Sequence, residues 1–200
     1  MGSGSSSIRR FHFKQTSGRD GTRARGNVAR TFRGDSIHKV DAKGRVSIPA
    51  SFRRALEEGD PDWTEGLSPK FVLVFGGKQQ KFLEVYTKEA AAEVDDRIRK
   101  LPRGTPQRRV LENLFGAQAV ELSIDDAGRM ILSPSLREKI GIDDQANFIG
   151  ATDTFQIWAP DDRQDQVEDL DDWISAQGDD FDPLTLLQLA DAPNPVSRQE

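Results

Sequence analysis

The chain has 200 residues, no cysteine and a net charge of −5 at pH 7. The lack of cysteine excludes disulfides, thiolate metal sites and cysteine nucleophiles, and the two histidines, His12 and His38, are too isolated to suggest a metal site. No apolar run is long enough to span a membrane and no secretory signal is visible, so the sequence predicts a cytoplasmic protein without a membrane partner.

The charges are distributed unevenly along the chain. Residues 1–54 contain thirteen Lys and Arg against three acidic residues, whereas residues 160–200 contain two against twelve. A local positive potential attracts a polyanion such as DNA whatever the net charge of the whole chain. The alternative interpretation is two solvated, disordered tails of opposite sign.

The first ordered elements are predicted from residue 32 onward. Residues 36–40 are typical of a strand, residues 41–44 of a turn and residues 45–48 of a second strand. Pro49 ends that strand and suits the first turn of a helix that we expect to reach residue 58.

A loop, a hairpin and two helices are expected next. Turn residues predict a loop over 59–69, and the apolar segments 71–75 and 82–86 predict a hairpin. Apolar residues at helical spacing predict a helix over 88–101, and a Thr-Pro start predicts another over 105–115. These two helices are either contacts between subunits or ordinary intrachain core.

The second half repeats the plan of the first and adds a last helix. In that helix we expect Val167, Leu170 and Ile174 to face the protein interior. The predicted elements are strands at 119–124 and 129–132 joined by a turn at 125–128, a short helix to residue 140, a hairpin of 147–150 with 155–158, and the helix 160–177.

A repeated phrase underlies this plan. Residues 40–48 (VDAKGRVSI) and 124–132 (IDDAGRMIL) share Asp, Gly and Arg at matching positions, and the similarity continues without a gap to residues 56 and 140. We therefore expect two copies of one supersecondary unit. A unit so small and rich in strands cannot cover its own sheet edges, so the copies must intertwine or pair with other subunits.

The repeated turn carries the chemistry of interest. Its glycine permits the positive φ of a tight turn, and its aspartate can accept hydrogen bonds from backbone N–H groups. Its arginine either closes the turn as a clasp with the aspartate or reaches outward, where a guanidinium suits phosphate oxygens and guanine edges. The residues concerned are Asp41, Gly44 and Arg45 in the first turn, and Asp125, Gly128 and Arg129 in the second.

Four phrases carry a resemblance to a known family: FRGD at 32–35, HKVDAKGR at 38–45, IPASFR at 48–53 and DDAGR at 125–129. Over about residues 31–177 the chain resembles the MraZ family, whose members carry two SpoVT/AbrB-like units. The resemblance implies a mixed α+β fold in which two tandem swapped-hairpin β units form a pseudo-symmetric barrel, with helices after each unit.

The composition and the repeat together predict a division of the chain. A basic disordered extension precedes the first repeat, helices link the repeats, and an acidic disordered tail follows the last helix. The expected segments are the extension 1–31, repeat one 32–87, the linking helices 88–116, repeat two 117–160, the C-terminal helix 161–177 and the tail 178–200.

The function implied is that of a DNA-binding transcriptional regulator associated with the nucleoid. Such a protein acts as a homo-oligomeric ring on direct-repeat promoter boxes of the division and cell-wall gene cluster, including its own operon. It needs no cofactor, metal or small-molecule substrate. On this hypothesis the DNA-binding residues are Lys43, Arg45, Arg129 and Arg53, and the turn-supporting residues are Asp41, Gly44, Asp125 and Gly128.

The sequence departs from the expected pattern in two places. Ala127 stands where the first turn has Lys43, so the second turn has one cation fewer, and Arg129 is either a DNA contact or chiefly a clasp. The thirty residues before Thr31 have no counterpart in the family pattern.

Three other functions are alternatives to the regulator. A ring-forming scaffold without direct DNA readout would use the basic turns only to join subunits. An AbrB-like antitoxin fits less well, because such chains usually hold one unit and a toxin-binding tail. An enzyme is disfavoured, because the sequence contains no P-loop, dinucleotide fingerprint or nucleophile elbow.

Overall fold

The computed structural model describes residues 31–190. The predicted basic extension, apart from Thr31, and the last ten residues of the acidic tail lie outside the described residues. Within them the first repeat forms β1 (Asp35–Lys39), β2 (Arg45–Ser47), α1 (Ala50–Glu58), β3 (Lys70–Val74) and β4 (Phe82–Thr87).

The helices that join the repeats are followed by a second set of elements in the same order. The joining elements are α2 (Lys88–Lys100), α3 (Pro106–Glu112) and a π-helical turn, η1 (Asn113–Ala117). The second set is β5 (Ala119–Ser123), β6 (Arg129–Ile131), α4 (Pro134–Lys139), β7 (Gln145–Ala151), β8 (Thr154–Trp158) and α5 (Pro160–Ser175), followed by a 3₁₀ helix, η2 (Pro183–Ala190).

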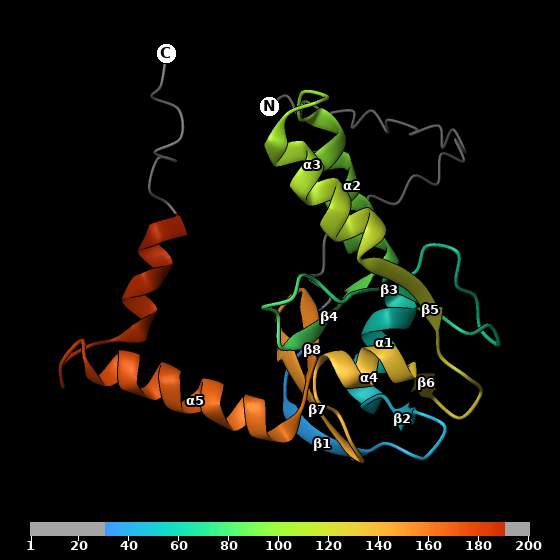
Figure 1. The fold of residues 1–200 in the computed structure, drawn as a ribbon. Helices are drawn as coiled ribbons and strands as arrows, with labels where there is room; N and C mark the ends of the chain where they lie inside the picture. Colours follow the sequence, from blue (N-terminus) through green and yellow to red (C-terminus); the bar gives the residue numbers. More distant parts are fainter. Residues whose placement is uncertain (1–30, 191–200) are drawn as a thin grey trace, which may run out of the picture.

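The strands of the two repeats are interleaved in the sheets. Six of them form an antiparallel sheet in the order β1-β7-β8-β4-β3-β5, and β2 pairs with β6 in a separate two-stranded ribbon (Figure 1). Of the strand pairs in residues 31–190, the hairpins β3–β4 and β7–β8 lie within one repeat, and the other four pairs join one repeat to the other. Each repeat therefore supplies edges that the other covers, as its small size requires.

The mixed α+β fold predicted from the sequence is confirmed. The six-stranded sheet is open, with β1 and β5 at its ends, and within residues 31–190 the strands do not close into a barrel. The first turn also joins strands that soon separate: Val40 and Val46 form a single bridge, after which β1 pairs with β7 and β2 with β6.

The hydrophobic core holds the ribbon and the large sheet together. Val46 and Met130, from the middle of β2 and β6, are buried in it. Phe52 of α1 packs against Phe32 and Phe155, with ring centroids 5.4 Å and 5.1 Å away. Because both repeats contribute to one core, the position of the ribbon is fixed relative to the sheet.

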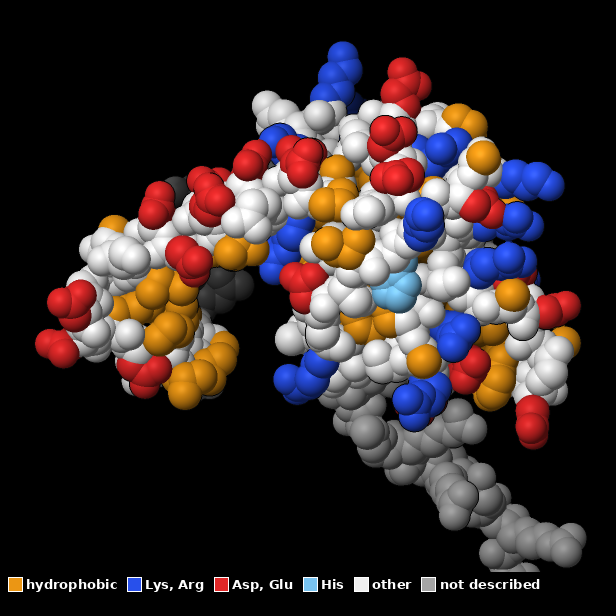
Figure 2. Space-filling view, turned by 90° about the horizontal axis from the view of Figure 1, so that it is seen from below, with side chains coloured by type: hydrophobic (Ala, Val, Ile, Leu, Met, Phe, Trp, Pro, Cys, Tyr) orange, Lys and Arg blue, Asp and Glu red, His pale blue; other side chains and the backbone are white. Residues whose placement is uncertain are grey.

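Two groups of helices extend from this body. Helices α2 and α3 lie side by side and project beyond the sheet, and α5 leads away from it in another direction (Figures 1 and 2). Thr87 and Thr105 cap the first turns of α2 and α3 by accepting bonds from Ala90 and Arg108 N–H groups. Among the described residues no helix combines the length and apolar character needed to cross a membrane.

The prediction that α5 faces inward is wrong for two of its three residues. Val167 is half-buried, but Leu170 and Ile174 are 50% and 39% exposed. The helical spacing of these residues was identified correctly, but spacing alone does not say what covers an apolar face. The tail segment 178–200, expected to be disordered, includes the 3₁₀ helix η2 in its described part.

Candidate nucleic-acid interface

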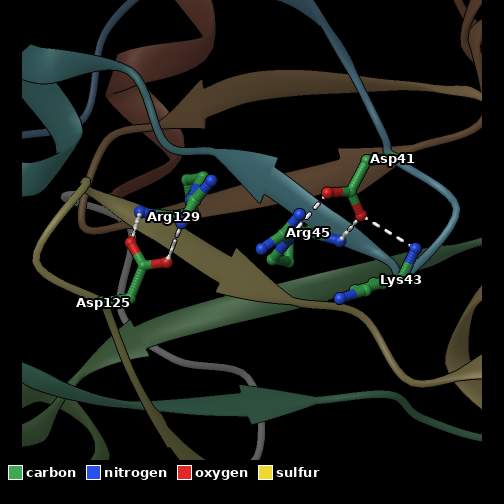
Figure 3. Close-up of polar contacts among 5 residues, drawn as sticks. All are labelled: Asp41, Lys43, Arg45, Asp125 and Arg129. Carbon is green, nitrogen blue, oxygen red and sulfur yellow. Dashed lines mark hydrogen bonds and ion pairs between the residues drawn. The ribbon is translucent and has the colours of Figure 1, made fainter.

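The first repeated turn is organised by the carboxylate of Asp41. Its Oδ1 accepts hydrogen bonds from the backbone N–H groups of Lys43 and Arg45, each at 2.9 Å. Its Oδ2 accepts a bond from Arg45 Nε at 2.6 Å (Figure 3). One aspartate therefore fixes both the backbone of the turn and the direction of the arginine.

The second turn repeats the same hydrogen bonds and adds one contact. Asp125 Oδ1 accepts bonds from the N–H groups of Ala127 and Arg129 at 3.0 Å and 2.9 Å. Its Oδ2 lies 2.9 Å from Arg129 Nε and 2.8 Å from Arg129 Nη2 (Figure 3). In each turn the arginine side chain is 35% exposed and the aspartate side chain 39% exposed, so both clasps lie at the surface.

The two turns also hold each other in place across the repeats. Gly44 has φ +78° and its carbonyl accepts a bond from Leu132 N–H at 2.8 Å, while Gly128 has φ +73° and accepts from Ile48 N–H at 3.1 Å. A Cβ atom at Gly44 would lie 2.2 Å from the carbonyl oxygen of Leu132. Glycine is required here for the backbone conformation and for this close approach.

The arginines lie on one solvent-facing side of the β2–β6 ribbon. In the register Arg45 is opposite Ile131, Val46 is opposite Met130 and Ser47 is opposite Arg129. Because side chains alternate along a strand and the central pair is buried, the other four face outward together. We call this surface the ribbon face; it comprises Arg45, Ser47, Arg129 and Ile131.

Each guanidinium retains hydrogen-bond donors. Arg45 uses only Nε on Asp41, and within residues 31–190 no partner is recorded for its Nη1 and Nη2 groups. Arg129 uses Nε and Nη2 on Asp125, which leaves Nη1. The sequence left open whether each arginine closes its turn as a clasp or reaches outward. The structure shows the clasp in both turns, with the remaining Nη groups named above available as donors.

The charge of the two turns differs. The first carries Lys43, which is exposed, whereas the second carries Asp126 and Ala127, also exposed. With the shared Asp and Arg included, the first turn is net positive and the second net negative. A polyanion should therefore be attracted more strongly to the first turn.

Arg53, the fourth predicted DNA-binding residue, lies against the turn of the opposite repeat. It is half-buried on α1, and its Nη1 occupies the space above Gly128, where an added Cβ would lie 1.7 Å away. The equivalent residue on α4, Arg137, reaches Gly44 in the same way. Arg53 and Arg54 also line a groove with Asp125 and Asp126 beside the second turn.

The electrostatics of the clasps follow from these contacts. Hydrogen bonds from the backbone and side chain of Arg45 lower the pKa of Asp41, and the side chain of Arg129 lowers the pKa of Asp125. The pKa of Arg129 is raised, first by its bond to Asp125 and also by the charge of Asp41. The two turns are thus within electrostatic reach of one another.

A pH dependence of stability follows. Each aspartate has a folded-state pKa below its usual value of about 3.9. The ionised aspartate therefore stabilises the fold fully above about pH 3.9, and this stabilisation is lost as the pH falls through the folded-state pKa. We expect Asp41→Asn/Asp125→Asn to be less stable than wild type at pH 7, with a difference that narrows below about pH 4. Urea denaturation between about pH 3 and pH 7 measures the difference in unfolding free energy. The control is Asp126→Asn. A constant difference would mean that the carboxylate charges contribute nothing.

Two residues of the ribbon face were missed by the sequence analysis. Ser47 and Ile131 lie between the arginines and are exposed, Ile131 to 58%. The signal was available, since Val46 and Ile48 alternate with Arg45 and Ser47, and Met130 and Leu132 with Arg129 and Ile131. What the alternation could not indicate was that β2 and β6 pair with each other.

Comparisons with known proteins identify the family of the chain. A family model described as "MraZ protein, putative antitoxin-like" matches residues 31–113 and 115–180. A transcriptional regulator MraZ from Ruegeria pomeroyi is 50% identical over 164 residues, which is 82% of this chain and 98% of that protein. A protein of the same name from Cereibacter sphaeroides is 41% identical over 80% of this chain and 98% of its own length. Another from Acidithiobacillus ferrooxidans is 34% identical over 64% of this chain and 82% of its own length. The chain belongs to the MraZ family.

Proposed function

We propose that this chain is a transcriptional regulator that binds double-stranded DNA through the ribbon face. The observation that carries the proposal is the pair of arginines held by matching aspartates on one exposed side of a two-stranded ribbon. The major groove of B-DNA, about 12 Å wide, admits such a ribbon. The relatives named transcriptional regulators support this function.

The roles of the site residues follow from their positions. Arg45 directs its free Nη groups at a base edge, with guanine O6 and N7 as the preferred acceptors. Arg129 makes a second, weaker contact because Asp125 engages two of its nitrogens and Asp126 adds negative charge nearby. Lys43 and Arg53 contact phosphates on either side. The aspartates orient the arginines and, being anionic, do not themselves meet the DNA backbone.

One chain offers few cationic contacts and would bind weakly at cellular salt. We therefore propose a homo-oligomeric ring that presents several ribbon faces to direct-repeat promoter boxes, so that the first contact raises the effective concentration of the others. The boxes proposed are those of the division and cell-wall gene cluster, including the chain's own operon. The same proposal includes a cytoplasmic location with nucleoid association. It also includes two swapped-hairpin repeats with the segment boundaries given above.

The proposal is tested with a direct-repeat promoter fragment and a shuffled fragment of equal length. We expect tighter binding to the direct repeats, with an affinity that falls steeply as salt rises. Equal affinity for the two fragments would show that the chain does not read the DNA sequence. A ring that assembles but binds no DNA at low salt would favour the alternative function of a protein-assembly scaffold.

Lys43 provides a separate prediction. If it contacts a phosphate, Lys43→Ala should weaken binding to the direct-repeat and shuffled fragments alike and reduce the slope of log affinity against log salt by about one. The matched control is Lys78→Ala, an exposed lysine in the β3–β4 loop. A loss confined to the direct-repeat fragment would instead make Lys43 a base-reading residue.

A further inference from the structure

The C-terminal arm, defined here as residues 160–190, exposes a large apolar surface. Leu187 and Leu189 of η2 are 68% and 71% exposed, and Trp173 near the end of α5 is 47% exposed. Figure 2 shows orange side chains gathered on the arm and bordered by red ones. Such a surface on a monomer marks a contact with another molecule. The exposed apolar residues are Leu170, Trp173, Ile174, Leu184, Leu186, Leu187 and Leu189.

An aromatic contact joins the two helices of the arm. Trp173 and Phe181 meet edge to face, with ring centroids 5.8 Å apart, across the turn that joins α5 to η2. Helix η2 extends over eight residues, longer than most 3₁₀ helices, and exposes apolar side chains on more than one side. A helix apolar on several sides is normally enclosed by neighbours.

The charge of the arm restricts what can cover it. It holds ten Asp and Glu against one arginine, Arg163, which already contacts Asp35 and Gln166. Two arms packed together would bring like charges into one interface, which is unfavourable. The partner surface should therefore be cationic, with some apolar area of its own.

The chain has such a surface at the end of the α2–α3 hairpin. Residues 97–109, named here the basic tip, contain six Lys and Arg and no acidic residue. Arg99 pairs with Asp95 and Asp96, and Arg108 pairs with Glu112. Among the described residues no ion pair is recorded for the other four cations, all exposed, and Val110 beside them is 65% exposed. These cations are Arg97, Lys100, Arg103 and Arg109.

We propose that the arm of one copy docks on the basic tip of a second copy. Within one chain the arm and the tip leave the body at separate places, with α5 against β7 and α2 against β3 and β4 (Figure 1). The contact joins two different surfaces, so the first copy keeps a free tip and the second keeps a free arm, and repetition of the contact generates a ring. The inference rests on the oligomer of the proposed function and assigns its contact.

The experiment uses two full-length variants whose substitutions lie outside the core. The arm variant is Leu184→Glu/Leu187→Glu and the tip variant is Arg103→Glu/Arg109→Glu. Native mass and sedimentation are measured for wild type, for each variant and for an equal mixture. Arg33→Glu/Lys78→Glu, with the same charge change as the tip variant at other exposed sites, is the control, and circular dichroism checks folding.

We expect wild type and control to form oligomers that loosen with rising salt, and each variant to be monomeric. The mixture should form a dimer of one arm variant and one tip variant, because only one intact arm and one intact tip remain to meet. Oligomers that persist in either variant, or a mixture that stays monomeric, would overturn the assignment while leaving the DNA-binding proposal intact. A monomeric wild type would instead remove the ring from the proposed function.

Discussion

Replacing Arg45 and Arg129 together with alanine is expected to weaken binding to a direct-repeat promoter fragment on the order of 100-fold or more. Each arginine that reads a base contributes about 1–3 kcal/mol, and the effects of two such contacts in one protein combine across the copies of an oligomer. The remaining binding should be insensitive to sequence, since Lys43 and the other cations contact phosphates. Fluorescence anisotropy at fixed salt measures the loss.

The single variants separate the two turns. Arg45→Ala should lose more affinity than Arg129→Ala, because Arg45 has both Nη groups unengaged by Asp41 and has Lys43 beside it. Arg45→Lys keeps the charge but loses the planar fork, so it should retain general affinity and lose preference for the direct repeats. Unchanged binding in the double variant, with oligomerisation intact, would exclude the ribbon face as the DNA contact.

The largest effect on stability is expected from Gly44→Ala, about 2–4 kcal/mol of unfolding free energy. The new Cβ would meet the carbonyl oxygen of Leu132 at 2.2 Å, and the backbone has φ +78°. Relief requires the turn to move away from β6, which breaks the 2.8 Å bond between Leu132 N–H and Gly44 oxygen. Urea denaturation at pH 7 gives the value.

Two other glycines separate the cost of the positive φ from the cost of the close contact at Gly44. Gly104 has φ +84° and no atom within 4 Å of an added Cβ, so Gly104→Ala should cost only about 1 kcal/mol from backbone strain. At Gly128 the obstruction is the end of the Arg53 side chain, which can rotate away, so Gly128→Ala should cost less than Gly44→Ala. Equal losses at Gly44 and Gly104 would mean that close packing of the turns adds no stability.

Local signals in the sequence predicted most elements of the fold. Proline after a cap residue marked the starts of α3 and α4, where Thr105 and Ser133 accept bonds from the first-turn N–H groups. The repeated Asp-x-x-Gly-Arg phrase predicted two turns with positive φ at glycine, as found at Gly44 and Gly128. These features depend on neighbouring residues, which is why a single sequence reveals them.

Features that depend on distant residues were not predictable. Nothing local indicates that β1 leaves β2 after the Val40–Val46 bridge, or that β2 pairs with β6. The approach of Arg53 to Gly128 follows from that pairing. The prediction that Leu170 and Ile174 face the interior was wrong for the same reason, since helical spacing does not show whether a distant element covers that face.

Contacts between the repeats couple the two Asp–Arg turns to each other. The glycine carbonyl of each turn accepts a hydrogen bond from a backbone N–H group of the other repeat, and each glycine lies beneath an arginine of the other repeat's helix. A shift of one turn is therefore transmitted to its twin. The arginines are held at a fixed separation, as a rigid two-point contact with DNA requires.

The most direct test attaches a photoreactive group to the ribbon face. The chain has no cysteine, so Ser47→Cys provides one labelling site beside Arg45 and Arg129, and Lys78→Cys in the β3–β4 loop provides the control. The account predicts that label at residue 47 cross-links to a direct-repeat promoter fragment and that label at residue 78 does not. DNA cross-linked through residue 78 but not through residue 47, under conditions where both proteins bind, would contradict it.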